Sequence, residues 1–138
     1  MMKFNFQNKN VFISGGTHGI GLSCIIEFAK LKANVITFSR DQKKIRLLKN
    51  KIKKFKTNNL IKKGDILDKD FIDNFSNKVK KKYKKIDILI HNVGGGGGWG
   101  KDNFLDTKDE VWQQVYEKNI NGLIYFTKNF LPLMVKNR

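Results

Sequence analysis

Four glycines lie within the segment "SGGTHGIG", directly after the short apolar run Val11 to Ile13. A glycine-rich turn between a strand and a helix lets backbone N–H groups approach a phosphate, because no side chain obstructs them. The positive end of the following helix also favours the negative charge of a pyrophosphate. The spacing of Gly15, Gly16, Gly19 and Gly21 therefore predicts a phosphate-binding turn.

Other glycine patterns compete with this interpretation. Gly16 to Ser23 nearly matches the loop Gly-x-x-x-x-Gly-Lys-Ser, but Leu22 stands where that loop needs its phosphate-binding lysine. The spacing also differs from the dinucleotide fingerprint Gly-x-Gly-x-x-Gly. A purely structural tight turn would use the same glycines and remains an alternative.

The elements that would position this turn alternate along the chain. Apolar runs predict strands over residues 11–14, 34–39, 59–66 and 86–92, and helical spacing predicts helices over residues 19–32, 41–55 and 68–83. Strands that alternate with helices form right-handed crossovers and a parallel sheet covered on both faces. The expected fold class is therefore α/β, with a doubly wound parallel sheet.

The helical spacing also identifies the side chains that should face the core. In the three predicted helices these are Ile20, Cys24, Ile25, Phe28 and Leu31, then Ile45, Leu48 and Ile52, then Phe71, Ile72, Phe75 and Val79. Near the C-terminus, Thr107 to Glu110 has the form of a capping box at the start of a long helix. We expect Pro132 to end or kink that helix.

Composition limits the possible classes of protein. The formal net charge is +16, and the densest lysine runs, residues 49–56 and 78–85, interleave lysine with apolar residues as amphipathic helices do. Solvated helix faces explain these runs better than a nucleic-acid surface, which stays a weaker alternative. Cys24 is the single cysteine, so an internal disulfide is excluded. No apolar run approaches the length of a membrane span and no secretory signal is evident, so a cytoplasmic protein is expected.

Several ordered motifs resemble the short-chain dehydrogenase/reductase family. The pattern Gly-x-x-x-Gly-x-Gly after the first strand is similar to its cofactor loop, and Gly64-Asp65 to its adenine-contacting aspartate. The segment "HNVG" at residues 91–94 resembles its Asn-Asn-Ala-Gly motif, although histidine and valine replace the first Asn and the Ala. Residues 118–134 resemble its helix with a catalytic-site asparagine, here Asn119.

The resemblance covers nearly the whole chain and implies one Rossmann-like NAD(P)-binding domain over residues 1–138. It implies reversible hydride transfer between a nicotinamide and a small carbonyl or alcohol substrate. The cofactor-binding residues that it implies are Ser14, Gly15, Gly16, Thr17, His18, Gly19, Ile20, Gly21, Ser39, Arg40, Asp65, Ile66, Asn92, Val93 and Gly94.

The end of the second predicted strand bears on the choice of cofactor. An acidic residue there would bind the adenine ribose and repel a 2′-phosphate, whereas an arginine would attract that phosphate. The sequence has Ser39 and Arg40, which favours NADP over NAD, although the neighbouring Asp41 could neutralise Arg40. His18 adds a hydrogen-bonding group but little charge at neutral pH.

Each of the other candidates also has a structural explanation. Asp65 could cap a turn, Asn119 could be a solvated helix residue, and residues 94–98 could cradle substrate or simply be a mobile loop. We expect His91 to be structural, Trp99 and Trp112 to be packing residues, and no metal site.

The proton-transfer pair of the family is missing from the sequence. Carbonyl reductases of this kind pair a tyrosine with a lysine four residues later, but Tyr83, Tyr116 and Tyr125 are followed at that distance by Asp, Ile and Asn. The resemblance implies that this pair lies beyond Arg138, so the chain is expected to be the N-terminal part of such an enzyme. The alternative is a complete but inactive dinucleotide-binding or interaction protein.

The missing segment has a consequence for packing. A full-length form is expected to be a homo-oligomer, and the sheet to continue with further strands. Without them we expect an incompletely covered apolar surface in the C-terminal helix, formed by Val111, Val115, Leu123, Phe126 and Phe130.

Overall fold

The computed structural model describes residues 4–95 and 103–136. Within them the strands form a four-stranded sheet in the order β3-β2-β1-β4, and every pair is parallel. The strands are β1 (Asn10–Ile13), β2 (Asn34–Ser39), β3 (Leu60–Lys63) and β4 (Ile88–Ile90). The predicted α/β fold with a parallel sheet is confirmed.

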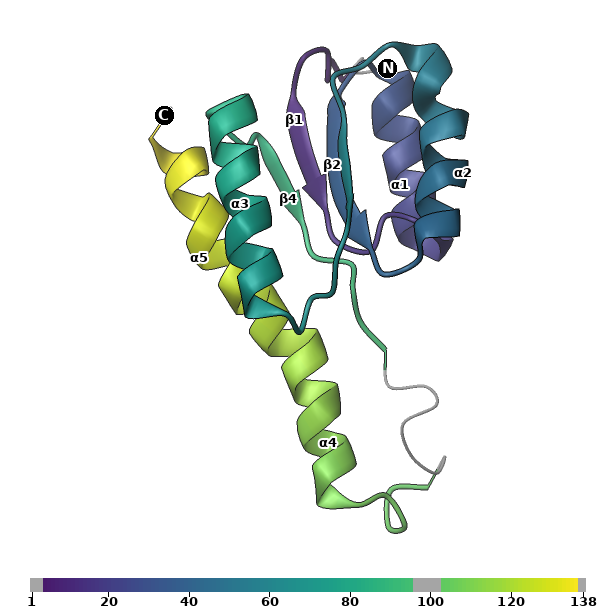
Figure 1. The fold of residues 1–138 in the computed structure, drawn as a ribbon, viewed down its shortest axis with the longest axis vertical. Coiled ribbons are helices and arrows are strands. Elements are labelled where there is room, and N and C mark those ends of the chain that lie inside the picture. Colours follow the sequence, from purple (N-terminus) through teal and green to yellow (C-terminus); the bar gives the residue numbers. More distant parts are fainter. Residues whose placement is uncertain (1–3, 96–102, 137–138) are drawn as a thin grey trace.

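Helices cover both faces of the sheet (Figure 1). They are α1 (Gly19–Lys30), α2 (Gln42–Ile52), α3 (Lys69–Tyr83), α4 (Asp109–Tyr116) and α5 (Gly122–Val135). A 3-10 turn, η1 (Lys53–Phe55), follows α2, and a π-helical turn, η2 (Glu117–Asn121), joins α4 to α5. Helices α1 and α2 lie on one face and α3 and α5 on the other, while α4 projects beyond the sheet.

Strand β1 shows why both faces need cover. All four of its residues are buried, as expected for a central parallel strand. Because successive side chains point to opposite faces, Val11 and Ile13 pack in the core beside α1 and α2, while Phe12 joins the core beside α3 and α5.

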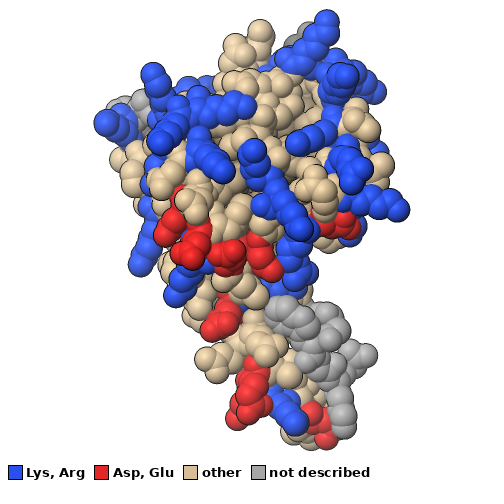
Figure 2. All heavy atoms as spheres, in the orientation of Figure 1, with Lys and Arg blue, Asp and Glu red and all other residues tan. Residues whose placement is uncertain are grey.

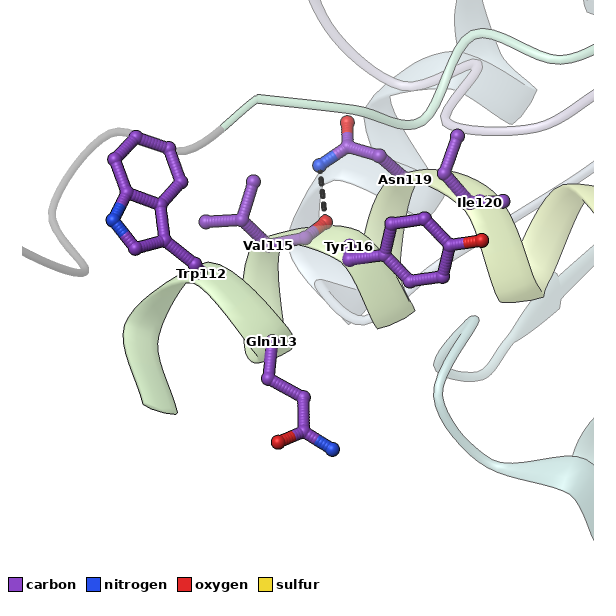
Figure 3. A pocket seen from close by; sticks show the side chains of 6 residues that line it. All are labelled: Trp112, Gln113, Val115, Tyr116, Asn119 and Ile120. Carbon is purple, nitrogen blue, oxygen red and sulfur yellow. Dashed lines mark hydrogen bonds between the residues drawn. The ribbon is translucent and has the colours of Figure 1, made fainter. Parts of the chain in front are cut away.

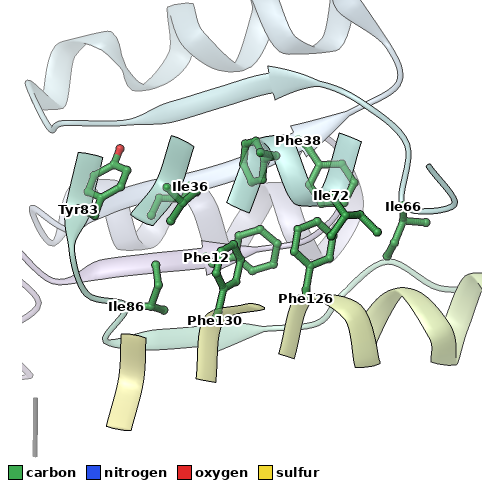
Figure 4. Packing of buried hydrophobic residues seen from close by; sticks show 11 residues of the cluster. Phe12, Ile36, Phe38, Ile66, Ile72, Tyr83, Ile86, Phe126 and Phe130 are labelled. Carbon is green, nitrogen blue, oxygen red and sulfur yellow. The ribbon is translucent and has the colours of Figure 1, made fainter. Parts of the chain in front are cut away.

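The core beside α3 and α5 is built largely from phenylalanine (Figure 4). The ring of Phe12 lies 4.9 Å from that of Phe126 and 4.8 Å from that of Phe130, centroid to centroid. Phe38 in β2 stacks on Phe126 at 5.2 Å. These aromatic contacts fix α5 against the sheet at the carboxyl ends of β1 and β2.

Two inward positions predicted in α1 are wrong. Ile20 is 78% exposed and Leu31 is 45% exposed. The buried line of α1 is Gly21, Ile25 and Ala29, at intervals of four residues. Ile20 lies about 100° from that line and Leu31 follows the last helical residue, so neither side chain reaches the core.

The C-terminal helices differ from the prediction in two ways. Helix α4 begins at Asp109 with Lys108 at the N-cap, so Thr107 does not hold the capping position, and its hydroxyl donates to the carbonyl of Asn103 at 2.7 Å. Pro132 does not end α5, which continues to Val135. Pro132 lacks the N–H that would donate to the carbonyl of Lys128, so it removes one helical hydrogen bond without ending α5.

The predicted uncovered surface also needs correction. Phe126 and Phe130 are fully buried, because α5 packs on both α3 and the sheet. Val111 and Val115 are half-buried, and Leu123 is 37% exposed. The exposed apolar side chains of α4, η2 and the start of α5 are Trp112, Tyr116, Ile120, Leu123 and Ile124.

Candidate functional site

The glycine-rich turn joins the carboxyl end of β1 to the start of α1. Gly15 and Gly19 have φ angles of 69° and 53°, in the left-handed region that favours glycine. The N–H of Gly16 donates to Thr37 Oγ1 at 3.1 Å, and this hydroxyl donates to the carbonyl of Ile13 at 2.6 Å. The first turn of α1 carries no acidic residue, so its N–H groups present a positive end to the space in front of it.

Asn92 and Ser14 attach the end of β4 to this turn. The side-chain amide of Asn92 donates to the carbonyls of Ser14 and Gly15, both at 3.2 Å. In return, Ser14 Oγ accepts the N–H groups of Asn92 and Val93 at 2.9 and 3.1 Å. A Cβ on Gly21 would come within 2.5 Å of the Asn92 amide, so only glycine leaves room for the hydrogen bonds of the Asn92 side chain.

A cavity of about 460 Å³ opens beside Gly15 and Asn92, at the carboxyl ends of the strands. Ligands in open α/β sheets bind at this edge. Its lining includes twelve of the residues singled out in the sequence: Gly15, Thr17, His18, Gly19, Ile20, Ser39, Arg40, Asp65, Ile66, Asn92, Val93 and Gly94. Ser14, Gly16 and Gly21 stand behind this lining and support it.

Four residues of the lining were not among the predicted cofactor-binding residues: Phe38, Gly64, Leu67 and Lys118. Gly64 stands in the Gly64-Asp65 motif, in which only Asp65 was given a role. Phe38 ends the apolar part of β2, and Lys118 directly precedes Asn119, so both lie beside motifs that the sequence does reveal. A Cβ on Gly64 would lie 2.1 Å from the Phe71 ring, which explains the glycine at that position.

The walls of the cavity have different chemistry along its length. Phe38, Ile66 and Val93 are apolar and also contact the core beside α3 and α5. Thr17 and Ser39 form the polar end, where Thr17 Oγ1 donates to Ser39 Oγ at 2.9 Å. Such a cavity suits a ligand with a flat apolar part, polar groups and an anionic group near the start of α1.

Arg40 and Asp65 lie at this polar end. Arg40 Nη1 is 3.6 Å from Asp65 Oδ2. Asp41, the neighbour that could neutralise Arg40, caps α2, since its Oδ1 accepts the N–H groups of Lys43 and Lys44. The Lys44 N–H, which donates to this carboxylate, lowers the pKa of Asp41.

Asn119 lies outside the lining but next to it, in the π-helical turn η2. Its Oδ1 accepts the N–H of Gly95 at 2.9 Å, and its Nδ2 donates to the carbonyl of Val115 at 2.6 Å. A Cβ on Gly94 would lie 2.7 Å from Asn119 Oδ1. Asn119 therefore connects η2 to the loop that follows β4.

Asn119 also lines a second, open hollow of about 530 Å³ on α4 and η2 (Figure 3). Its lining is Trp112, Gln113, Val115, Tyr116, Asn119 and Ile120. Trp112 and Tyr116 are exposed here. Trp112 nevertheless packs on Phe104, with 5.3 Å between the ring centroids. Trp99 and residues 96–98 lie outside the described residues.

The tyrosines of the described chain lie away from the cavity. Tyr83 is buried and donates its hydroxyl to the carbonyl of Asn58 at 2.8 Å, and burial raises the pKa of this phenol. Tyr116 is exposed on α4, and the ring of Tyr125 lies beneath Lys69. None of the three lines the cavity.

His91 lies between the end of β4 and α5. His91 Nε2 lies 3.0 Å from Thr127 Oγ1 of α5, and burial lowers the pKa of this imidazole.

Within residues 4–95 and 103–136, no three or more His, Cys, Asp or Glu side chains are arranged to hold a metal ion. In the same residues, no helix is both long and apolar enough to cross a membrane.

Comparison with known proteins agrees with this geometry. The family model described as short chain dehydrogenase matches residues 9–138. The short chain dehydrogenase pigC of Monascus ruber is 28% identical over 99% of this chain and 46% of its own length. The chain thus spans about half the length of the curated relatives it matches.

Solved structures share the fold over a similar extent. The NADH-dependent reductase A1-R′, complexed with NAD, is 26% identical with a TM-score of 0.80, over 93% of this chain and 52% of that one. The L-sorbose reductase of Gluconobacter frateurii, complexed with NADPH and L-sorbose, has a TM-score of 0.88 at 23% identity, over 99% of this chain and 51% of that one. From the family match over residues 9–138, we conclude that the chain belongs to the short chain dehydrogenase family.

Proposed function

We propose that the cavity binds a nicotinamide dinucleotide, with NADP preferred over NAD, and that the protein is an oxidoreductase acting on a small carbonyl or alcohol substrate. The observation that carries this proposal is the convergence of the glycine turn, the end of β2 and the end of β4 on one cavity. The family match is consistent with it.

The shape of the cavity supports a dinucleotide. A Cβ on Gly15 would lie 2.9 Å from the Val93 side chain, so glycine lets the turn pack closely against the end of β4. The pyrophosphate would bind at the start of α1, where N–H groups and the helix dipole favour an anion. The apolar walls of Phe38, Ile66 and Val93 would hold a flat ring.

Assignments within the cavity follow the same chemistry. Gly15, Thr17, His18, Gly19 and Ile20 would form the pyrophosphate side, supported from behind by Ser14, Gly16 and Gly21. Ser39 and Arg40 would contact the 2′-phosphate, Asp65 and Ile66 the adenine, and Asn92, Val93 and Gly94 the ribose nearer the nicotinamide. Lys118 adds a positive charge to the lining near the end of β4, where its Nζ donates to the carbonyl of Gly95 at 3.4 Å.

In the proposed reaction, a bound nicotinamide supplies or accepts a hydride. The hydrogen bonds of the Asn92 side chain hold the glycine turn against the end of β4, and Asn119 orients the neighbouring loop at Gly95. The proton that accompanies hydride transfer needs an acid within hydrogen-bond reach of the substrate. The family resemblance assigns that acid to a Tyr-x-x-x-Lys segment that the sequence of residues 1–138 does not contain.

Removal of Arg40 tests the cofactor preference. In the purified full-length protein, we expect Arg40→Ala to weaken NADPH binding by about 10-fold, the loss of one charge-assisted contact, and to change NADH binding little. Titration of each dinucleotide, followed by its fluorescence, gives both dissociation constants.

Arg46→Ala is the matched control, because it removes the same exposed charge from α2 outside the cavity lining. Equal losses of NADPH and NADH affinity in Arg40→Ala would contradict the preference for NADP. No binding of either dinucleotide by the unaltered protein would contradict the proposed function.

A further inference from the structure

Arg40 and Asp65 connect two loops at the same end of the cavity. Arg40 follows β2 and Asp65 follows β3, and both line the cavity. Their side chains are 70% and 35% exposed, with 3.6 Å between Nη1 and Oδ2. The ion pair is therefore loose and accessible to water.

The carboxylate is the anchored member of this pair. Asp65 Oδ1 accepts the N–H of Leu67 at 3.1 Å, which leaves Oδ2 facing Arg40. Asp41 is closer to Arg40 in sequence, but its Oδ1 accepts two N–H groups at the start of α2. The anion that Arg40 meets across the cavity is thus Asp65.

We propose that Asp65 limits the preference of the site for a 2′-phosphorylated adenosine by competing with the phosphate for Arg40. This inference rests on the proposed function, in which Arg40 binds that phosphate. A phosphate within reach of Arg40 approaches the Asp65 carboxylate as well, and the two negative charges repel each other. The carboxylate therefore weakens phosphate binding both by occupying Arg40 and by direct repulsion.

Asp65→Asn tests the inference in the purified full-length protein. The variant removes the charge but keeps an oxygen that accepts the Leu67 N–H. Because partly exposed pairs contribute little, we expect the affinity for 2′,5′-ADP to rise about two- to fivefold relative to that for 5′-AMP at low salt. Any change at the adenine contact of Asp65 affects both ligands, so the ratio of their affinities isolates the effect on the 2′-phosphate. Calorimetric titration measures both ligands.

Two further variants separate competition for Arg40 from a general change in charge. Asp41→Asn removes the same charge beside Arg40 while keeping a residue that caps helices well, and we expect a smaller gain from it. In an Arg40→Ala background, Asp65→Asn should lose most of its effect, because the group for which the ligand competes is absent. Asp65→Ser, which also keeps an acceptor oxygen, repeats the test if Asp65→Asn does not fold.

The outcomes are distinct. A rise in the affinity for 2′,5′-ADP relative to 5′-AMP that depends on Arg40 supports the inference. An unchanged ratio of these affinities in Asp65→Asn, an equal rise in Asp41→Asn or a full rise without Arg40 overturns it and leaves the proposed function standing. An unaltered protein that binds neither nucleotide overturns the proposed function, and this inference with it.

Discussion

At the scale of single residues, Asp87 is the most thoroughly paired acid of the described chain. Its Oδ2 accepts the N–H of Asn10 at 2.8 Å, and its Oδ1 lies 3.1 Å from Lys85 Nζ and 3.6 Å from Lys9 Nζ. Burial alone would raise the pKa of Asp87, but the Asn10 N–H and the two lysines together lower it below its ordinary value. The ionised carboxylate therefore connects the first residue of β1 to the residue before β4 and stabilises both strand starts.

Asp87→Asn tests this contribution. We expect the variant to lose about 1–2 kcal/mol of unfolding free energy at pH 7, because charged hydrogen bonds are replaced by neutral ones. Since the folded pKa is lowered, the contribution is complete above the unfolded value of about 3.9 and is lost as pH falls through the folded pKa. Urea unfolding at pH 7 and pH 3 measures the difference between the two proteins.

The exposed pair of Glu27 and Lys30 provides the control for Asp87. Their side chains are 63% and 50% exposed, so Glu27→Gln should change the unfolding free energy by less than about 0.5 kcal/mol. A difference between Asp87→Asn and the unaltered protein that is as large at pH 3 as at pH 7 would contradict the assignment to ionised Asp87.

Most of the cavity lining was predictable from residue types, and the exceptions have a physical explanation. Glycines at a strand-to-helix turn and polar residues at strand ends mark the site because parallel strands bring their carboxyl ends to one edge. Whether Asp41 or Asp65 meets Arg40 depends on which carboxylate the backbone already occupies, and sequence order does not reveal that. The place of Lys118 likewise depends on the direction of a side chain on η2.

At the scale of elements, α3 follows rules that the sequence displays. Asp68 caps it by accepting the N–H of Phe71 at 2.9 Å, and Asp70 and Asp73 lie near its start. Lysines gather towards its end, where positive charge favours the helix dipole. The predicted limits of residues 68–83 are therefore close to the observed Lys69–Tyr83.

The C-terminal helices were predicted less well, because their form depends on tertiary contacts. The π-helical turn η2 lies where Asn119 bonds to Gly95 and Gly122 faces Ile66, and a Cβ on Gly122 would lie 2.2 Å from the Ile66 side chain. Neither contact has a local sequence pattern. Likewise, Phe126 and Phe130 were expected to belong to an incompletely covered surface, because the sequence does not show that α5 packs against Phe12.

His91 connects the end of β4 to α5 and makes this junction sensitive to pH. Burial lowers the pKa of His91, so below about pH 6.5 the unfolded chain binds a proton that the folded chain resists. We expect the unfolding free energy to fall between pH 7.5 and 5.5, and the fall to be smaller in His91→Gln. Urea unfolding across this range measures both slopes, and identical slopes would contradict the role of His91.

At the scale of the whole molecule, charge is unevenly distributed (Figure 2). On the face shown, Lys and Arg cover much of the upper part, while Asp and Glu gather in a band across the middle and on the projection that contains α4. The net charge of +16 opposes compaction, because like charges repel across the folded surface.

Salt should therefore stabilise the protein. We expect the melting temperature to rise by several degrees between about 0.05 and 0.5 M NaCl, since the screening length falls from over 10 Å to below 5 Å. Sodium chloride is preferable to sulfate, which also stabilises proteins by exclusion from their surface. Calorimetry at each salt concentration measures the change, and a melting temperature that falls would show that attraction between opposite charges dominates.

The side chains of Phe38, Ile66 and Val93 serve the cavity and the aromatic core at once. Behind them stand Phe75 and Phe126, which the cavity does not touch. A substitution that changes the volume of either ring shifts the side chains of Phe38, Ile66 and Val93 that pack against it. Over evolutionary time the family fold can thus reshape the cavity through buried positions, while every residue that lines the cavity stays the same.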